Sequence, residues 1–292
     1  MTPDRSFHLV INPASGGGTA TEVGVALAKQ LRDAGATISL TYSGSEEQSR
    51  QVVRDVVARG EVVVAVGGDG MVNSIAGDVV RAGGVLGIAP AGRGNDFARQ
   101  LGISNDIEEV TRLLLTGDER AVDVIDAGGR IVVGSVYAGI DSLASEIVNN
   151  AKYTPKFMQY QVASVRALAA SKVTTYSLTI DGISHTFDGY TVIAANSGYY
   201  GAGMHPAPDA KVDDGLLDIV ILGADSKLRL LRAMPKMYDG SHVALESVTI
   251  LRGKNIRIEA ETAVNAFGDG EYLAPLPIDV AILPGALNVI AP

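Results

Sequence analysis

Two glycine turns in the first third of the chain carry residues that could bind a phosphate group. The apolar run 62–66 leads into GGDG at 67–70, and a second apolar run leads into PAGRGNDF at 90–97. Glycines permit positive φ and close approach of a phosphate to backbone N–H groups. A carboxylate such as that of Asp69 repels phosphate, so we expect it either to act through Mg²⁺ or to accept hydrogen bonds that shape the loop.

Two further groups of carboxylates stand in the second half of the chain. The stretch KVDDGLLD at 211–218 puts Asp213 and Asp214 in a turn before a strand, where Asp oxygens and backbone carbonyls can bind a hard cation. An ordinary Asp-Gly hairpin turn would explain only one of the two. The stretch FGDGE at 267–271 puts Asp269 and Glu271 on a glycine-flanked bend, where a carboxylate can accept the proton of an attacking hydroxyl.

Asn95 and Asp96 come after the second glycine turn and open a short helix that ends near residue 101. Asn at such a position most often only caps the helix, and we interpret Asn95 first in that way. Because Asp96 is expected at the same sheet edge as Asp69, it is also a candidate for a Mg²⁺-nucleotide site or an acceptor-hydroxyl site.

The elements that position the glycine turns alternate between strands and helices. Such alternation predicts a parallel sheet with helices on both faces, and it places glycine loops 12–18, 67–70 and 90–94 beyond the carboxyl ends of the strands, where ligands bind. The first loop has no Lys-Ser or Lys-Thr after its glycines and lacks the Rossmann spacing, which disfavours a P-loop and a dinucleotide fingerprint. The predicted strands are 7–12, 38–42, 62–66 and 85–89, with helices through about 34 and over 46–58 and 72–81.

A change of pattern near 123–128 predicts a second domain made mostly of antiparallel strands. Helical interruptions are expected over 141–171 and 226–238. We predict an α/β domain over 1–125 and a β domain over 126–283, with about 284–292 as a candidate to complete the first. The strands of the second domain are predicted at 130–137, 173–180, 187–195, 217–222, 247–251, 255–260 and 278–283.

Composition excludes several classes of protein. The chain has 292 residues, of which 47% are hydrophobic, so it can bury two cores, and its formal charge of −9 argues against nucleic acid as a partner. It contains no Cys, which rules out disulfides and thiolate metal sites within it. Without a long apolar run or a signal-peptide pattern, a cytoplasmic location is expected.

Two basic segments suit the surface of an anionic membrane, although solvated helices with snorkelling side chains would look the same. Between Ile147 and Ile180 there is no acidic residue, and Ser226 to Tyr238 interleaves cations with Leu and Met. The first segment contains Lys152, Lys156, Arg166 and Lys172 with Tyr153, Phe157, Met158 and Tyr160, and the second contains Lys227, Arg229, Arg232 and Lys236.

Taken together and in this order, the motifs resemble the diacylglycerol kinase catalytic family, especially its soluble bacterial lipid kinases. The resemblance runs from Val10 to Glu271 and includes NPxSG at 12–16, GGDG at 67–70, PxGxGNDFA at 90–98, DDGLLD at 213–218 and GDGE at 268–271. It implies a doubly wound nucleotide domain related to NAD kinase and phosphofructokinase, followed by a β-sandwich domain.

The resemblance also implies roles for individual residues. The proton acceptor falls on Glu271, with Asp269 as the other essential carboxylate, and a structural Mg²⁺ falls on Lys211, Asp214 and Leu216, partly through carbonyls. The nucleotide contacts fall on Asn12, Thr41, Gly67, Gly68, Asp69, Gly70, Met71, Val72, Asn73, Gly92, Arg93, Asn95 and Asp96.

This chain departs from the family pattern at Met71, where Thr is usual, and at Arg93, where Thr or Ser is usual. Loss of the two hydroxyls would weaken nucleotide binding by about 1 kcal/mol each if both bonds are made in the family. A guanidinium at position 93 can compensate by gripping a phosphate with paired hydrogen bonds, or change the choice of phosphoryl donor.

The activity that the resemblance implies is transfer of the γ-phosphoryl group of ATP, with Mg²⁺, to diacylglycerol, giving phosphatidic acid for phospholipid biosynthesis. The alternatives are a kinase for a sphingoid base, ceramide or another lipid, an NAD kinase, and a silent nucleotide- or lipid-binding protein. The resemblance implies a homodimer, although nothing in the residues requires one. A lipid substrate places the protein at the inner face of the membrane.

Overall fold

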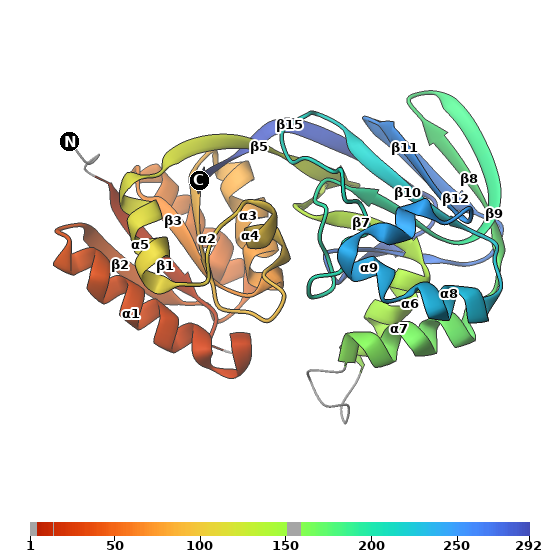
Figure 1. Ribbon diagram of the computed structural model, residues 1–292. Coiled ribbons are helices and arrows are strands. Elements are labelled where there is room, and N and C mark those ends of the chain that lie inside the picture. The colour runs from red at the N-terminus through yellow and green to blue at the C-terminus, as the bar shows by residue number, and fades with distance from the viewer. Residues whose placement is uncertain (1–4, 14, 151–158) are drawn as a thin grey trace. The chain divides into compact units, whose positions relative to one another are not determined.

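The computed structural model describes residues 5–13, 15–150 and 159–292, which form two compact units. Unit 1 comprises Met1–Val124 and Pro284–Pro292, and unit 2 comprises Ile125–Leu283. The chain passes from unit 1 to unit 2 within strand β5 (Asp118–Ala127) and returns within strand β15 (Ile278–Ala291). Figure 1 labels most of the helices and strands of the two units.

Unit 1 is built on a parallel sheet whose inner strands carry mostly buried apolar side chains, while the residues of the edge strand are exposed or half-buried. The order is β2-β1-β3-β4, and the last residues of β15 extend it through parallel pairing of Asn288 with Val85. Val and Ala runs such as 62–66 suit central strands that are covered on both faces. The strands are β1 (Ser6–Ile11), β2 (Thr37–Tyr42), β3 (Val62–Gly67) and β4 (Val85–Pro90).

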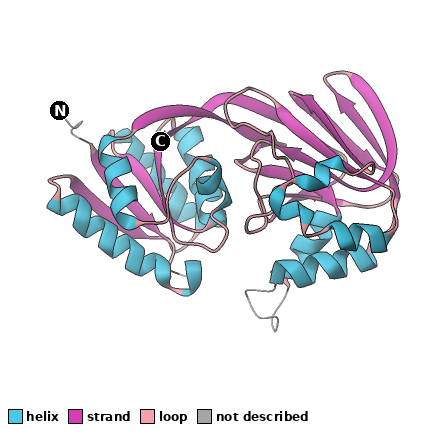
Figure 2. Cartoon of the chain, in the orientation of Figure 1, coloured by secondary structure: helices cyan, strands magenta, loops and turns pink. Residues whose placement is uncertain are grey.

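Helices cover both faces of this sheet, as predicted. Helices α1 and α5 pack together, as do α2 and α3 (Figure 2). The helices are α1 (Thr19–Asp33), α2 (Glu46–Ala58), α3 (Asp69–Ala82), α4 (Asp96–Gln100) and α5 (Ile107–Thr116), with a 3₁₀ turn η1 (Ser15–Gly17). Sequence reasoning missed α5, although Asp106 caps it by accepting the N–H groups of Glu108 and Glu109.

Unit 2 is an antiparallel β structure in which one long strand has two sets of partners. In β9 (Ile183–Ala195), the first half pairs with β8 and the second half pairs with β7 and β10. The full order is β14-β13-β7-β9-β8-β12-β15, with β11 beyond β10. The other strands are β6 (Arg130–Val132), β7 (Ser135–Gly139), β8 (Thr174–Ile180), β10 (Leu217–Gly223), β11 (Val248–Gly253), β12 (Asn255–Ala260), β13 (Asn265–Gly268) and β14 (Glu271–Pro275).

One apolar core lies within these strands, with Tyr176, Leu178, Ile219 and Ile258 fully or almost fully buried. Smaller clusters on other faces include one formed by Leu168, Tyr190 and Leu230, which joins helices to β9. A core shared by several antiparallel strands stabilises a sandwich. The prediction of a β-sandwich second domain is therefore confirmed.

The helical insertions differ in detail from the prediction. The region 141–171 contains α6 (Ile140–Asn149) and α7 (Gln159–Ala170), and the predicted basic residues Lys152 and Lys156, with Tyr153, Phe157 and Met158, lie outside the described residues. The region 226–238 is broken into α8 (Lys227–Ala233) and α9 (Lys236–Asp239), followed by η3 (Ser241–Ala244). Pro235 explains this break, because proline has no N–H to continue a helix. No helix in the described part of the chain is long and apolar enough to cross a membrane.

Candidate active site

The two predicted glycine turns of unit 1 lie back to back at the carboxyl edge of the sheet. Gly67 and Pro90, the last residues of β3 and β4, are register partners. The Ala91 N–H donates to the Gly67 carbonyl at 2.8 Å, and a Cβ on Gly68 would lie 3.1 Å from the Cα of Gly92. Since no side chain fits between them, glycine at 68 and 92 is required by close backbone approach.

Asp69 holds the second turn in place. One carboxylate oxygen accepts the Asp96 N–H at 2.5 Å and the other accepts the Asn95 N–H at 2.9 Å. Burial raises the pKa of Asp69, and the N–H donors at the start of α4 oppose that rise. Of the two expectations for this carboxylate, the geometry matches the one in which it shapes the loop.

The side chain of Asn95 does not cap α4, so that prediction is wrong. Asn95 occupies the N-cap position with φ of 50°, but its side-chain oxygen accepts the Gly92 N–H at 2.9 Å and its amide donates to Asn105 at 3.0 Å. In the left-handed conformation the side chain folds over its own turn, and Asp69 supplies the cap from a different strand-helix connection. Asp96 is buried, with 7% of its surface exposed.

Other predicted nucleotide contacts lie around the same edge. The Asn12 N–H donates to the Val66 carbonyl at 3.2 Å, which ties the first glycine loop to β3. The Thr41 hydroxyl lies 3.0 Å from Nε2 of the buried His8 on the neighbouring strand. Gly70 is exposed and Asn73 is half-buried in the first turns of α3.

Met71 and Val72 can contribute to a nucleotide site only through their backbones. Their side chains are 7% and 4% exposed, and a Cβ on Gly67 would lie 2.8 Å from the Cβ of Met71. The departure at position 71 therefore replaces a hydroxyl by a packed apolar side chain. Arg93, the second departure, is exposed.

In unit 2, Asp269 and Glu271 belong to the tight hairpin between β13 and β14. Asp269 and Gly270 form its two-residue turn with φ of 47° and 90°, as Asp-Gly turns of type I′ require. The Asp269 carboxylate accepts the backbone N–H groups of Val133, Gly134 and Ser135 at 2.9–3.1 Å. Asp269 therefore binds the hairpin to the start of β7.

Glu271 is placed differently from its neighbour. It is exposed, and among the described residues its carboxylate makes no hydrogen bond or ion pair. The Gly270 N–H just before it donates to the Tyr137 hydroxyl at 3.0 Å. The hairpin thus holds a rigid turn and presents a carboxylate that no described residue engages, which suits a proton acceptor.

The predicted cation turn over 211–218 lies at the same sheet edge as this hairpin. Asp218 is the register partner of Ala195, and Ala195 is the partner of Ser135, whose N–H binds Asp269. The Asp214 carboxylate accepts the Leu216 N–H at 3.1 Å and an Arg252 N–H at 2.5 Å. Lys211 is exposed.

The side chains of this turn do not by themselves form a divalent-cation site. Such a cation needs several oxygen ligands, and each oxygen of Asp214 already accepts one N–H, one of them from the positively charged Arg252. No group of three or more His, Asp or Glu side chains in the described part of the chain is arranged to hold a metal. Burial raises the pKa of the nearby Asp218, and Arg252 opposes that rise.

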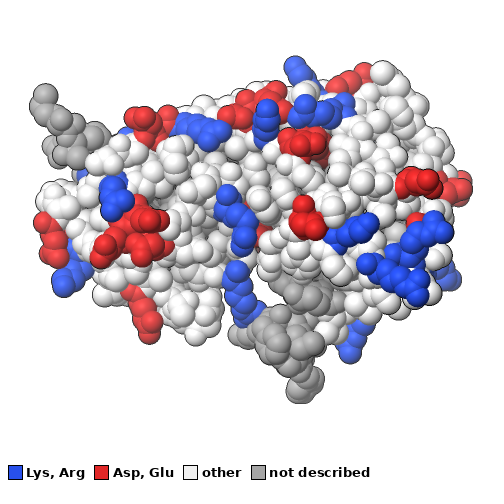
Figure 3. All heavy atoms as spheres, viewed as in Figure 1, with Lys and Arg blue, Asp and Glu red and all other residues white. Residues whose placement is uncertain are grey.

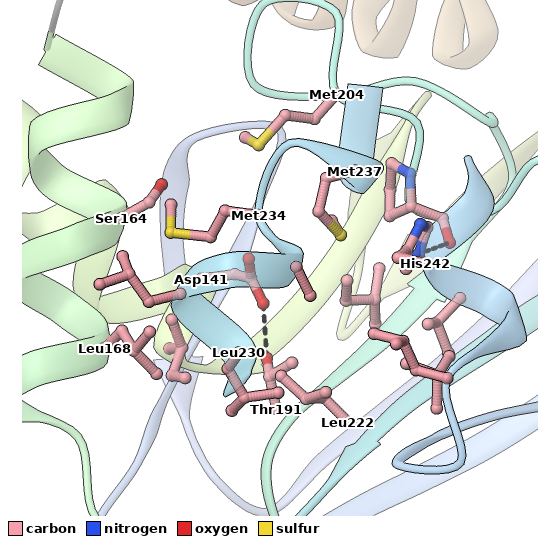
Figure 4. Close-up of a pocket in the computed structure, with 18 of the residues that line it drawn as sticks. Asp141, Ser164, Leu168, Thr191, Met204, Leu222, Leu230, Met234, Met237 and His242 are labelled. Carbon is pink, nitrogen blue, oxygen red and sulfur yellow. Dashed lines mark hydrogen bonds between the residues drawn. The ribbon is translucent and has the colours of Figure 1, made fainter. Parts of the chain in front are cut away.

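An apolar cavity of about 480 Å³ lies in unit 2 under α7, α8 and α9 (Figure 4). The side chains of Val165, Leu231 and Tyr238 line it and are each more than 40% exposed, so its mouth opens to solvent. Its remaining walls include Ile140, Leu168, Ile193, Met204, Val220, Leu222, Leu230, Met234, Met237, Leu245 and Val248.

One carboxylate stands in the wall of this cavity. Asp141 accepts the Tyr200 hydroxyl at 2.5 Å and the Thr191 hydroxyl at 2.7 Å. Burial and the neighbouring Asp141 raise the pKa of Tyr200, which stays a neutral donor. The Tyr200 ring lies 5.7 Å from that of Tyr137, whose hydroxyl accepts the Gly270 N–H. A continuous set of contacts therefore joins the cavity to the Glu271 hairpin.

Comparison with known proteins agrees with this arrangement. Residues 6–127 match the diacylglycerol kinase catalytic domain family, and residues 134–291 match the YegS C-terminal NAD kinase beta sandwich-like domain. A diacylglycerol kinase of Mycobacterium tuberculosis (strain H37Rv) is 30% identical over 289 residues, covering 96% of this chain and 93% of the relative. The chain belongs to the diacylglycerol kinase catalytic family. It is therefore a lipid kinase.

More distant relatives share the length and fold of this kinase. A diacylglycerol kinase of Bacillus subtilis (strain 168) is 22% identical, covering 99% of this chain and 97% of the relative. A solved diacylglycerol kinase of Bacillus anthracis str. Sterne matches with a TM-score of 0.76 at 19% identity, over 100% of this chain and 98% of that one. At this identity, the structural likeness shows the fold alone.

Sequence reasoning missed four residues whose side chains the fold brings together in the kinase's second unit. Asp141, Thr191 and Tyr200 meet at the cavity from α6, β9 and the segment after β9. Asp141, the acidic residue inside the mostly apolar stretch 135–145, was the one available signal. Arg252 was missed because nothing near position 252 in the sequence shows that it faces Asp214.

Proposed function

We propose that this lipid kinase transfers the γ-phosphoryl group of ATP to the hydroxyl of diacylglycerol, giving phosphatidic acid. The observation that carries the proposal is the apolar cavity of unit 2, whose polar wall connects through Tyr200 and Tyr137 to the Glu271 hairpin. A cavity of about 480 Å³ with apolar walls suits acyl chains, because their burial is driven by loss of water contact. The free hydroxyl of the glycerol backbone would then be held near Glu271.

In the proposed reaction, the Glu271 carboxylate accepts the proton of the attacking hydroxyl as its oxygen bonds to the γ-phosphorus. The bond to the β-phosphate oxygen of ATP breaks, and ADP leaves. The backbone N–H groups around Gly68 and Gly70 are the proposed donors to the phosphates, and Arg93 is a candidate to bind them through its side chain. Mg²⁺ that enters with ATP would neutralise charge on the phosphates during transfer.

Asp269 has a different part in this proposal. Its carboxylate accepts hydrogen bonds from three backbone N–H groups, so Asp269 acts as a positioning residue for the hairpin. Asp69 does the same for the glycine turns of unit 1. Glu271 then remains the proton acceptor of the predicted pair.

The cavity mouth supports a further part of the proposal, that the kinase takes its acceptor from an anionic membrane. Leu228 on α8 is 57% exposed and Leu231 is 41% exposed. Figure 3 shows Lys and Arg gathered over α8. Exposed Leu can enter the lipid interface, and each nearby cation adds about 1 kcal/mol of attraction to anionic lipid. A cytoplasmic location, at the inner membrane face, would follow.

A second acceptor has one observation in its favour. The Asp141 carboxylate in the cavity wall would pair with a cationic amine, which a sphingoid base carries and diacylglycerol lacks. In diacylglycerol, the hydroxyl would be the group that donates a hydrogen bond there. The two acceptors are therefore distinguished by their dependence on the charge of Asp141.

The test is transfer of ³²P from labelled ATP and Mg²⁺ to mixed micelles of diacylglycerol, sphingosine or ceramide, with NAD and no-lipid controls. We expect label in phosphatidic acid. Ser164→Phe, which fills the cavity from α7, should raise the KM for diacylglycerol at least about tenfold, while Ala170→Phe at an exposed position of the same helix should not. Label in another lipid would replace the acceptor, and no label in any acceptor would argue for a silent binding protein.

A further inference from the structure

Arg252 connects two carboxylates at the turn over 211–218. Its Nη2 lies 2.5 Å from one oxygen of Asp214, and its Nε and Nη2 lie 3.2 and 3.3 Å from the two oxygens of Asp218. A guanidinium presents planar paired donors, so one side chain can bind two carboxylates in fixed directions. The Arg252 guanidinium therefore supplies a positive charge to this turn.

The register of the sheet determines this placement. Arg252 on β11 is the direct partner of Asp218 on β10, so the two side chains are cross-strand neighbours. The Asp218 side chain is 4% exposed and the Arg252 side chain is 44% exposed. A buried carboxylate needs a partner of opposite charge, and the arginine supplies it without leaving solvent.

Asp214 completes the turn by binding its own backbone. One oxygen accepts the Leu216 N–H at 3.1 Å, two residues ahead, across Gly215, which has a φ of 70°. The other oxygen is the one bound to Arg252. A divalent cation placed on Asp214 would share oxygens that already accept an N–H each and would lie beside a positive guanidinium, which repels it.

We propose that Arg252 takes the place of the structural divalent cation that the family resemblance implies at Lys211, Asp214 and Leu216. The turn, and the sheet edge that it shares with Ser135 and the Asp269 hairpin, then keep their shape without Mg²⁺. The metal requirement of the kinase is left to the nucleotide alone. This proposal concerns metal bound without nucleotide, so it stands or falls independently of the acceptor lipid.

The direct test counts Mn²⁺ bound by the full-length protein without nucleotide or lipid, using the paramagnetic resonance signal of free Mn²⁺. Wild type and Asp214→Asn are expected to bind the same number of ions. If the wild type binds one ion that Asp214→Asn loses, the turn holds a cation and the proposal is overturned. This comparison needs no change at Arg252, so a folding defect in an arginine variant does not affect it.

The second test is thermal unfolding in EDTA and in excess MgCl₂. The wild-type Tm should differ by less than about 1 °C between the two conditions, and Arg252→Gln should lower it by about 3 °C or more. Excess Mg²⁺ should restore part of the Tm of Arg252→Gln, because the uncovered carboxylates can then bind it. Arg252→Lys should lose less than Arg252→Gln, since it keeps the charge.

Arg257→Gln is the matched control, because Arg257 is similarly exposed and pairs with Glu259 and Asp279 on the same and the neighbouring strand. Its Tm should show no response to Mg²⁺. The proposal is contradicted if EDTA lowers the Tm of the wild type. It is also contradicted if excess Mg²⁺ leaves the Tm of Arg252→Gln unchanged.

Discussion

Two hairpin turns of unit 2 have the same sequence and nearly the same backbone. Asp181-Gly182 joins β8 to β9 with φ of 47° and 86°, and Asp269-Gly270 joins β13 to β14 with φ of 47° and 90°. In both, the Asp carboxylate accepts backbone N–H groups from a distant segment. Asp181 binds those of Lys254 and Asn255, and Asp269 binds those of Val133, Gly134 and Ser135.

The two turns differ in the residue that comes next in the chain. Ile183 comes after the first, whereas Glu271 comes after the second, and the Gly270 N–H before it is bound by Tyr137 next to the cavity. An Asp-Gly turn with a bound carboxylate is thus a structural device that this fold uses at least twice. Chemistry is expected where such a turn also holds an unengaged carboxylate beside a place for a substrate.

The largest effect is expected from removing that unengaged carboxylate. Glu271→Gln should lower kcat by about 10²–10⁴-fold, the usual contribution of a general base. Its unfolding free energy should change by less than about 0.5 kcal/mol, because the side chain is exposed. The measurements are steady-state transfer to diacylglycerol and thermal unfolding, with the exposed Glu261→Gln as control. A kcat of Glu271→Gln within about threefold of the wild-type value would show that Glu271 is not the proton acceptor.

The glycine turns of unit 1 should be broken by a single methyl group. Gly92→Ala would bring its Cβ against Gly68 and within 2.8 Å of the Asn95 side chain, at a cost of about 1–3 kcal/mol in unfolding free energy. Binding of a non-hydrolysable ATP analogue, measured by calorimetry, should weaken with it. Gly70→Ala has open space and lies in α3, so its stability should be unchanged or raised. Equal losses in the two variants would show that crowding is not the cause.

Substitution of Asp181 and Asp269 tests the comparison between the two Asp-Gly turns directly. Asp269→Asn and Asp181→Asn should each lower the unfolding free energy by about 1–2 kcal/mol, because an amide cannot accept all of the backbone N–H groups. Only Asp269→Asn should also lower kcat, by about tenfold at matched folded fraction, since Glu271 then loses its fixed position. Urea unfolding and kcat measured on the same preparations decide this. A drop in kcat for Asp181→Asn would indicate a general loss of structure instead.

The smallest predicted effect concerns the unfolding free energy. The contributions of Asp181 and Asp69 to it should change with pH in opposite directions. Hydrogen bonds from the Lys254 and Asn255 N–H groups lower the pKa of Asp181, so its stabilisation is present above its ordinary pKa of 3.8 and is lost as pH falls through the lowered value. Burial raises the pKa of Asp69, so its contribution is present below 3.8 and is lost as pH rises through the raised value.

Urea unfolding between about pH 3 and pH 6.5 measures both. The stability of wild type relative to Asp181→Asn should increase with pH, while that of wild type relative to Asp69→Asn should decrease. If both stability differences change with pH in the same direction, burial does not dominate the pKa of Asp69.

The sequence alone determined the alternation of strands and helices in the first unit and most strands of the second. Apolar runs that end in glycine turns carry this information locally, and Glu46–Ala58 was predicted with its observed bounds. The family followed from the order of five motifs. The sequence also placed Asp269 and Glu271 on one bend, because two residues so close in the chain must share it.

Only the tertiary structure decided what each carboxylate does. The N–H groups that bind Asp269 come from positions 134 to 136 residues away, those that bind Asp69 come from 26 and 27 residues away, and Arg252 reaches Asp214 across 38 residues. A motif records which residue types are present but not which distant donors satisfy them. A carboxylate is free for chemistry only when the fold leaves it unbound, and long-range packing determines that.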